Sequence, residues 1–250
     1  MNDSPGSPTH KKLFYIHETP SLLFILKPAM VHSVRRGRGP SKSLSAIDCL
    51  EKQYLWAKSV RPNTSDGCLC NRLDFSTSGI LIAAKSDQIW EKVREQFSHK
   101  EIKKKYRCLV DGHLDQPREI QAFLGNRYKN SKKVTVFPPS SNQGILTTSS
   151  VTPIEHSQEF HCTLVEVTTS SGARHQVRAH LAHIRHPLSG DKLYGSLSTL
   201  ENTCPRLLRK DSEQDRMFYL EAFEVEMTDP QSTERLKVTL KDCESVFATS

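Results

Sequence analysis

Short apolar runs typical of β-strands limit what this chain can fold into more than any other feature, and one of them, at 159–170, approximately alternates. They lie at residues 13–33, where two runs are separated by a turn, and at 80–84, 104–112, 144–154, 159–170, 217–227 and 234–240, with weaker runs near 118–124 and 133–137. Helical periods occupy residues 43–56, 87–100 and 171–186. The helices do not alternate strictly with the strands. The pattern predicts an α+β fold, with a largely antiparallel, mixed central β-sheet and flanking helices.

The length and composition favour one domain and a polyanionic partner. The 250 residues suit a single domain over 13–250, preceded by a disordered, Ser- and Pro-rich tail over 1–12. The formal net charge of +7 favours RNA or DNA as a partner. Seven scattered cysteines without a C-x-x-C pair indicate reduced thiols in a cytoplasmic protein. No run approaches the roughly 20 apolar residues of a membrane helix, so we expect no membrane partner.

A polar segment stands directly before the apolar run at 80–84. Asp74 lies in this segment, in NRLDFSTSG. A lone Asp before Ser, Thr and Gly is most often a turn residue whose side chain stabilises the loop. A carboxylate mounted on a loop just ahead of a buried strand also suits a nucleophile or a base.

The helical period at 171–186 carries two arginines beside an apolar stripe. Arg174 and Arg178 are four residues apart, so we expect them to share a helix face. Val177, Leu181 and Ile184 form the adjoining stripe. Two arginines alone are more often a solvated basic face than a binding site.

Four histidines in the same region do not predict a metal site. They are His175, His180, His183 and His186. Their angular positions spread around the helix, and no Cys or carboxylate completes a zinc-binding spacing. We therefore expect no metal at these histidines.

A basic run opens the strand at 104–112, and the loop at 34–42 is also basic. The run contains Lys100, Lys103, Lys104, Lys105 and Arg107 around a single aromatic residue, Tyr106. An exposed, charged strand start is the plain interpretation. The functional one is contact of Lys103 and Lys104 with RNA phosphates and stacking of a base on Tyr106.

Together these segments resemble one enzyme family. NRLDFSTSGILIAAKS (71–86) is similar to the H-R-L-D-x-x-T-S-G-L-L block of the RluA-type pseudouridine synthases, and KKKYRCLVDG (103–112) to their K-x-Y strand. GARHQVRAHLAHIRHPLSGDKLYG (172–195) resembles their G-R-x-H-Q-I-R-x-H block, and LFILKPAMVHS (23–33) their N-K-P stretch. The resemblance covers roughly residues 13–230 and implies the pseudouridine synthase fold, as a catalytic domain without the N-terminal RNA-binding module of some members.

The resemblance also implies roles for single residues. Asp74 falls on the essential aspartate, Arg178 on the basic residue paired with it, and Tyr106 on the tyrosine that packs against uracil. Arg72 falls on the arginine that helps displace the target base, and Leu220 on an apolar residue of the pocket. We add Lys103, Lys104 and Arg174 as RNA-binding candidates. The implied reaction isomerises uridine in rRNA or tRNA to pseudouridine without a cofactor, and we expect a monomer.

Some positions depart from the family pattern. Asn71 and Glu221 stand where His is usual, Ala173 where Arg is common and Ala179 where Val is frequent. None removes a proposed catalytic group, but Asn71 and Glu221 leave the choice of RNA open. Whether Asp74 attacks the sugar or removes a proton from its 2′ position also stays open. The alternative function is a non-catalytic RNA-binding or RNA-chaperone protein that retains the fold.

Overall fold

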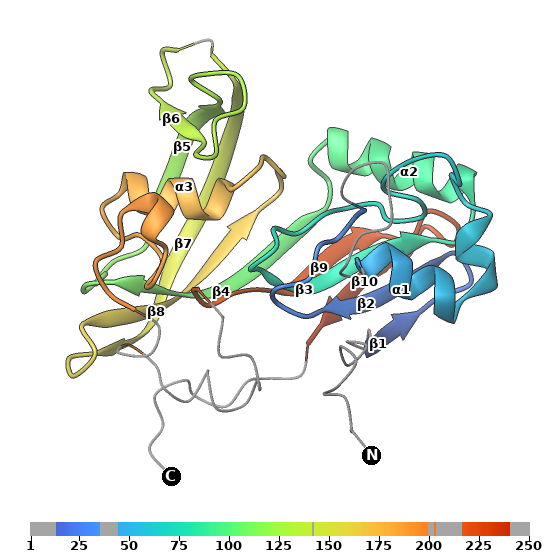
Figure 1. Cartoon of the computed structure of the whole chain (residues 1–250), viewed down its shortest axis with the longest axis horizontal. Helices are drawn as coiled ribbons and strands as arrows, with labels where there is room; N and C mark the ends of the chain where they lie inside the picture. The colour runs from blue at the N-terminus through green and yellow to red at the C-terminus, as the bar shows by residue number, and fades with distance from the viewer. Residues whose placement is uncertain (1–13, 36–44, 142, 200–202, 204–216, 241–250) are drawn as a thin grey trace, which may run out of the picture.

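The computed structural model describes residues 14–35, 45–141, 143–199, 203 and 217–240 (Figure 1). The expected N-terminal tail and nearly all of the basic loop at 34–42 lie outside these residues. In the described parts of the chain, ten strands form one sheet with the order β1-β2-β3-β9-β4-β8-β7-β5-β6, and β10 pairs with β9.

The strands and helices have the following bounds. The strands are β1 (Phe14–Glu18), β2 (Leu22–Lys27), β3 (Ser78–Ala84), β4 (Lys103–Asp111), β5 (Arg118–Gly125), β6 (Thr135–Phe137), β7 (Ile145–Ser157), β8 (Cys162–Thr169), β9 (Leu220–Thr228) and β10 (Arg235–Thr239). The α-helices are α1 (Ala46–Gln53), α2 (Asp87–Ser98) and α3 (Gln176–His183), and the 3₁₀ turns are η1 (Leu55–Lys58) and η2 (Lys192–Tyr194).

The sheet is mixed, as predicted, because a single pair of its strands is parallel. That pair is β3 and β9, which meet at Ser78–Glu221 and Gly79–Ala222, whereas the other pairs of the described sheet are antiparallel. This short parallel contact joins the half that contains β1, β2 and β3 to the half that contains β4 to β8. The α+β class is confirmed.

Helices cover both faces of the sheet around β3. Leu81 and Ala83 of β3 pack into a core shared with α1 and α3. Ile80 and Ile82 point to the opposite face and pack with Val93 of α2. Because both faces are buried, β3 carries a continuous apolar run in place of an alternating one.

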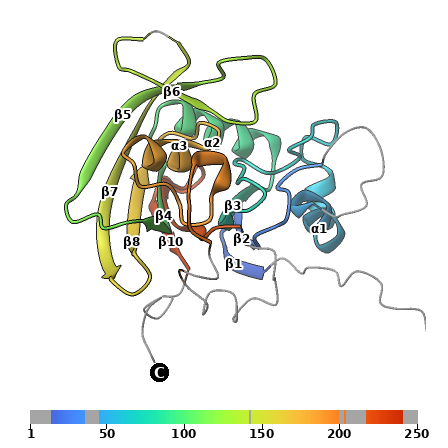
Figure 2. The same ribbon diagram turned by 60° about the vertical axis from the view of Figure 1, so that its left-hand side comes forward.

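A projecting arm extends from one half of the molecule. It consists of β5, β6 and the first part of β7, residues 118–150 without residue 142, and it rises beyond α3 in Figures 1 and 2. Its loop between β5 and β6 carries four exposed basic side chains, Arg127, Lys129, Lys132 and Lys133.

The three α-helices are shorter than their predicted ranges, and one of them also begins later for a reason that the backbone shows. Ser86 caps α2 as predicted, its Oγ accepting from the Ile89 amide. The helix predicted from 171 begins only at Gln176, because His175 has φ +55°, a left-handed conformation that cannot belong to the helix. Arg174 therefore precedes the helix, and the expectation that Arg174 and Arg178 share a helix face is wrong.

Candidate active site

A cavity opens where the two halves of the sheet meet α3. It contains six of the eight predicted site residues: Arg72, Asp74, Lys104, Tyr106, Arg178 and Leu220. These side chains come from the loop before β3, from β4, from β9 and from α3. Segments more than 140 residues apart in the sequence thus meet at one site. Lys103 and Arg174 do not line the cavity.

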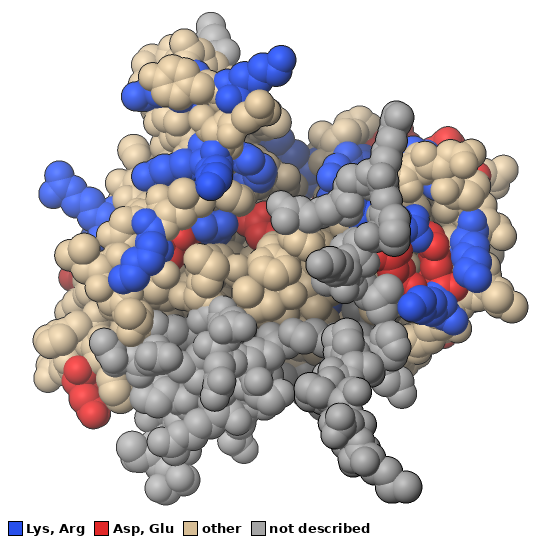
Figure 3. All heavy atoms as spheres, viewed as in Figure 1, with Lys and Arg blue, Asp and Glu red and all other residues tan. Residues whose placement is uncertain are grey.

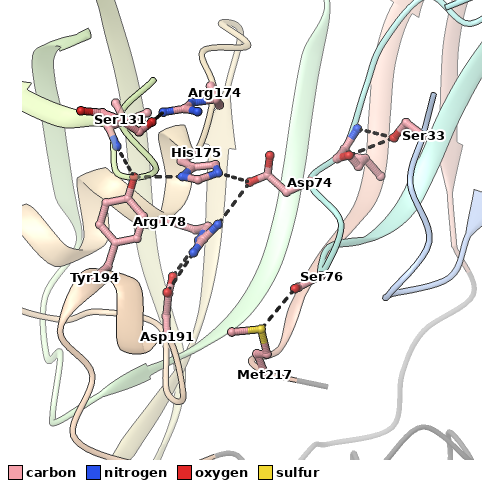
Figure 4. A network of polar contacts seen from close by, with 12 residues as sticks. Ser33, Asp74, Ser76, Ser131, Arg174, His175, Arg178, Asp191, Tyr194 and Met217 are labelled. Carbon is pink, nitrogen blue, oxygen red and sulfur yellow. Dashed lines mark hydrogen bonds and ion pairs between the residues drawn. The ribbon is translucent and has the colours of Figure 1, made fainter. Parts of the chain in front are cut away.

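The loop that carries Asp74 is fixed on both sides. Ser33 accepts from the Leu73 amide at 2.9 Å and donates to the Leu73 carbonyl at 2.9 Å, so one side chain clamps the residue before Asp74 (Figure 4). The Thr77 amide donates to the Asp74 carbonyl at 3.1 Å and closes the turn. The Asp74 side chain, 28% exposed, is left to face the cavity. The loop therefore positions the carboxylate without using it as a turn-forming group.

Arg178 binds two carboxylates. Its Nε and one terminal nitrogen donate to both oxygens of Asp191 at 2.7 and 2.9 Å, and its other terminal nitrogen lies 3.7 Å from Asp74 Oδ2 (Figure 4). Burial lowers the pKa of Arg178, but the hydrogen bonds and charge of Asp191 and the charge of Asp74 outweigh it, so the pKa is raised overall. The predicted approach of Arg178 to Asp74 is present, although its tighter partner is Asp191, which the sequence did not single out.

His175 approaches the same oxygen of Asp74. Its Nε2 lies 3.8 Å from Asp74 Oδ2, and its Nδ1 lies 3.1 Å from the Tyr194 hydroxyl (Figure 4). Burial, with the charges of Arg178 and Arg174, lowers the pKa of His175 against the opposing effect of Asp74. His175 is therefore neutral near pH 7. Within the described residues, no hydrogen bond or ion pair reaches Asp74 Oδ1.

Tyr106 and Leu220 form an apolar wall of the cavity. They are 9% and 4% exposed and belong to the core that includes α3. Burial, and next the charge of Asp74, raises the pKa of Tyr106, so its hydroxyl stays protonated. No described residue is hydrogen-bonded to this hydroxyl. The ring can therefore pack against a flat ligand while the hydroxyl donates to it.

The basic run on β4 is not uniformly exposed. Lys103 is exposed, as predicted, but Lys104 is 6% exposed and its Nζ donates to the Ser171 carbonyl at 2.8 Å. Burial, and next the charge of Arg94, lowers the pKa of Lys104 to about 8. The expectation of a surface lysine at 104 is wrong. Alternation along β4 puts Lys104 on the same inward side as Tyr106, and this signal was available in the sequence.

The two remaining arginines lie at the edges of the site. Arg72 is 63% exposed, lines the cavity and pairs with Asp66 at 3.3 Å. Arg174 donates to Asn126 Oδ1 at 2.9 Å and to the Ser131 carbonyl at 2.7 Å, so it ties the start of α3 to the loop of the arm.

Two of the four departures from the family pattern, Asn71 and Glu221, make hydrogen bonds within the fold. Asn71 donates to the Ile80 carbonyl at 3.2 Å and accepts from the Ile82 amide at 2.8 Å, extending the hydrogen bonds of β3. Glu221 accepts from the Tyr219 hydroxyl at 3.3 Å. Neither residue lines the cavity.

The histidines of α3 have separate environments. His180 is fully buried, with its ring nitrogens at 3.0 Å from the Thr147 and Ser149 hydroxyls, so it is a core residue with both nitrogens in use. Within the described residues, no three His, Cys, Asp or Glu side chains form a group that would hold a metal ion. No helix in those parts of the chain is long and apolar enough to cross a bilayer.

The chain is similar in sequence to known pseudouridine synthases. The chain is 29% identical over 194 residues to the ribosomal large subunit pseudouridine synthase D of Zymomonas mobilis, covering 76% of this chain and 58% of that protein. It is 31% identical over 134 residues to the tRNA pseudouridine synthase C of Salmonella typhi, covering 51% and 52%. It thus spans less than two thirds of each relative.

Solved structures show the same fold. Human RNA pseudouridylate synthase domain containing 1 matches with a TM-score of 0.66 and 21% identity, over 96% of this chain and 86% of that one. A sequence model of the family described as RNA pseudouridylate synthase matches residues 21–183, more than half of the 250 residues. The chain therefore belongs to the RNA pseudouridylate synthase family, a family of isomerases that act on RNA.

Proposed function

We propose that this chain isomerises uridine in RNA to pseudouridine and that Asp74 is the carboxylate that acts on the ribose. The observation that carries the proposal is the position of Asp74 in the cavity. Arg178 and His175 both approach Oδ2, and no contact within the described residues occupies Oδ1. One oxygen is held by the protein, and the other is available to the substrate.

The reaction requires an anionic carboxylate beside the ribose and a cavity that retains the detached uracil. The bond between ribose C1′ and uracil N1 breaks, the uracil turns, and a new bond forms from C1′ to uracil C5. C5 then loses its proton, and N1 takes up one. Asp74 must be anionic whether it attacks C1′ or removes the C2′ proton, and Arg178 orients it by charge-assisted attraction. The detached uracil stays between Tyr106 and Leu220, whose apolar surfaces exclude water.

The target base reaches this cavity only by leaving its stack. Enzymes that act on a base within structured nucleic acid extrude the nucleotide into a pocket. The exposed Arg72 at the cavity edge is suitably placed to occupy the vacated position. Tyr128 on the arm is 72% exposed and lies between basic residues, which suits stacking on a neighbouring base.

RNA is held by the basic side chains around the cavity and on the arm. Lysine and arginine side chains gather on the arm and on the same face as α3 (Figure 3). The arm loop supplies Arg127, Lys129, Lys132 and Lys133, all exposed, and β4 supplies Lys103. This second basic run was missed at the sequence level, although four cations in seven residues are a visible signal. Phosphate contacts of this kind position an RNA without reading its sequence.

The substrate is a structured RNA, rRNA or tRNA. One similar protein is named for the large ribosomal subunit and another for tRNA. The alternative is an RNA-binding protein without catalysis. The presence of Asp74, Arg178 and Tyr106 in one cavity favours the enzyme.

The test compares wild type with Asp74→Asn on RNA labelled with tritium at uracil C5. We expect wild type to release tritium, and Asp74→Asn to bind RNA with nearly unchanged affinity while losing several orders of magnitude in rate, because the anionic group is gone. Binding without release by the wild-type protein, on both rRNA and tRNA fractions, would favour the alternative function.

A further inference from the structure

We propose that His175 is a positioning residue for Asp74, held as the tautomer that carries its proton on Nε2 by a hydrogen-bond chain that starts in the arm. This inference rests on the proposed function, because it assigns His175 the task of orienting the reacting carboxylate. The hydrogen bonds run from the Val134 amide through the Tyr194 hydroxyl to His175 Nδ1, and His175 Nε2 in turn faces Asp74 Oδ2 at 3.8 Å (Figure 4).

The Tyr194 hydroxyl determines the tautomer. It accepts from the Val134 amide at 3.0 Å, and its other polar neighbour among the described residues is His175 Nδ1 at 3.1 Å. Burial raises the pKa of Tyr194, so the hydroxyl keeps its proton, and Tyr194 is 5% exposed, so that proton needs a partner in the protein. In the parts of the chain that the structure describes, one acceptor lies within reach of this proton, an unprotonated His175 Nδ1. The proton of neutral His175 is therefore on Nε2.

The Asp74 carboxylate favours the same tautomer. Nε2 lies 3.8 Å from Oδ2, which is too far for a hydrogen bond, although the N–H directed at the carboxylate is attracted to it. In the opposite tautomer a nitrogen lone pair would face a carboxylate oxygen, and the buried Tyr194 proton would have no acceptor. Catalytic contacts are often long without substrate and shorten in the complex. His175 then holds Oδ2 from one side while Arg178 holds it from the other, and Oδ1 is directed to the ribose.

The backbone conformation of His175 supports a role for its side chain at Asp74. His175 has φ +55° at the N-terminal end of α3, and its side chain does not cap that helix. Non-glycine residues in this region are strained, although His, Asn and Asp adopt it more readily than most. The bend aims the imidazole at Asp74 and away from the helix end.

The chain also couples the active site to the arm. Val134 lies directly before β6, and Lys133 lies with its Nζ 5.2 Å from the centre of the Tyr194 ring. An RNA that moves the loop of the arm changes the position of the Val134 amide, the donor that holds the Tyr194 hydroxyl. The orientation of Asp74 thus depends on the loop that carries the basic run.

Two substitutions of His175 separate this role from a backbone role. Glutamine places an amide N–H near the position of Nε2 but disfavours the left-handed backbone. Asparagine favours that backbone but is too short to reach Asp74. We expect kcat of His175→Gln to stay within about 10-fold of wild type and kcat of His175→Asn to fall about 100-fold, the loss that a misplacement of about 1 Å produces, with KM unchanged in both. Tyr194→Phe, which keeps the ring, should lower kcat about 10-fold.

His161 provides the matched control. It has φ +48°, is exposed and lies at the turn between β7 and β8, outside the cavity. His161→Gln and His161→Asn should both turn over at the wild-type rate. If His175→Asn is as active as wild type and His175→Gln is the weaker variant, as backbone preference alone predicts, the inference is wrong.

Nitrogen NMR of the protein without substrate identifies the tautomer of His175 independently of any activity measurement. With ¹⁵N-labelled histidine, we expect the His175 Nδ1 resonance in the range of an unprotonated imidazole nitrogen, and in Tyr194→Phe a shift toward mixed tautomers. A protonated Nδ1 in the wild type would overturn the inference. Asp74→Asn separates the two proposals: if it turns over normally the proposed function fails, whereas an inactive Asp74→Asn beside a fully active His175→Asn refutes the role of His175 alone.

Discussion

At the residue scale, the site is organised around charged groups removed from water. Arg178 and Asp191 are 9% and 0% exposed at their side chains and share two hydrogen bonds, whereas Asp74 is partly exposed. Asp191 therefore fixes Arg178, and Arg178 in turn orients Asp74. The resemblance predicts Asp74 and Arg178 but not Asp191, the buried carboxylate on the other side of Arg178. Thirteen positions separate Asp191 from Arg178, and their meeting depends on the turn after α3.

Arg178→Ala should harm both stability and catalysis. The substitution leaves the Asp191 carboxylate buried without its partner, and breaking a buried ion pair from one side costs roughly 3 to 5 kcal/mol. Asp74→Ala removes a partly exposed carboxylate and should cost much less. Thermal melting and single-turnover kinetics on both variants check this. Equal melting temperatures for the two would show that Asp191 does not depend on Arg178.

Lys104 should make stability depend on pH in the alkaline range. Its pKa is lowered to about 8 from the usual 10.5, mainly by burial. Between these values the unfolded chain binds the proton and the folded chain does not, so folding is favoured as the pH rises from 8 to 10.5. The gain is about 3 kcal/mol for the whole window. In urea unfolding, the free energy of unfolding of wild type should rise by this amount between pH 8 and 10.5 relative to that of Lys104→Met, which keeps the other titrating groups. If the free energy of unfolding changed with pH in the same way for wild type and Lys104→Met, the pKa of Lys104 would not be lowered in the folded protein.

At the scale of the elements, the parallel contact between β3 and β9 joins the two halves that make the site. Asp74 precedes β3, Leu220 begins β9, and Tyr106 lies on β4 beside β9. The strands themselves were predictable from their apolar patterns. The start of α3 was not, since the left-handed conformation of His175 is imposed by tertiary contacts and helical periodicity continues through it.

Gly79→Ala should disrupt this junction. Gly79 has φ +127°, and an added Cβ would lie 2.4 Å from the Ala222 carbonyl oxygen and 2.5 Å from its amide nitrogen, which are backbone atoms of the paired strand. Gly195 has φ +96° with no atom within 4 Å of an added Cβ, so Gly195→Ala carries backbone strain alone, about 1 to 3 kcal/mol. Denaturant unfolding should show a clearly larger loss for Gly79→Ala. A loss no greater than that of Gly195→Ala would show that the strands separate easily.

At the scale of the whole molecule, a basic surface surrounds the cavity that contains the Asp74 carboxylate. The net charge is +7, and the arm extends the basic surface beyond α3 (Figure 3). The charge could be predicted from composition. Its placement on the arm could not, because the pairing of β5, β6 and β7 determines where the loop points.

RNA affinity should therefore fall steeply with salt. Replacing Lys103, Lys129 and Lys132 with Gln should flatten the slope of log K against log salt by about 0.7 per lost contact for single-stranded RNA. Lys92 on α2, across the sheet from α3, is the control, and Lys92→Gln should leave the slope unchanged. Filter binding over a series of salt concentrations measures this. If the triple variant had the same slope as wild type, these three lysines would not contact the RNA.

The most direct test of the account is to map pseudouridine in the rRNA and tRNA of cells that lack this protein and are complemented with wild type or with Asp74→Asn. We predict that wild type restores pseudouridine at one or a few defined uridines and that Asp74→Asn, at equal protein level, restores none. Restoration of the same sites by Asp74→Asn would contradict the claim that the Asp74 carboxylate performs the isomerisation.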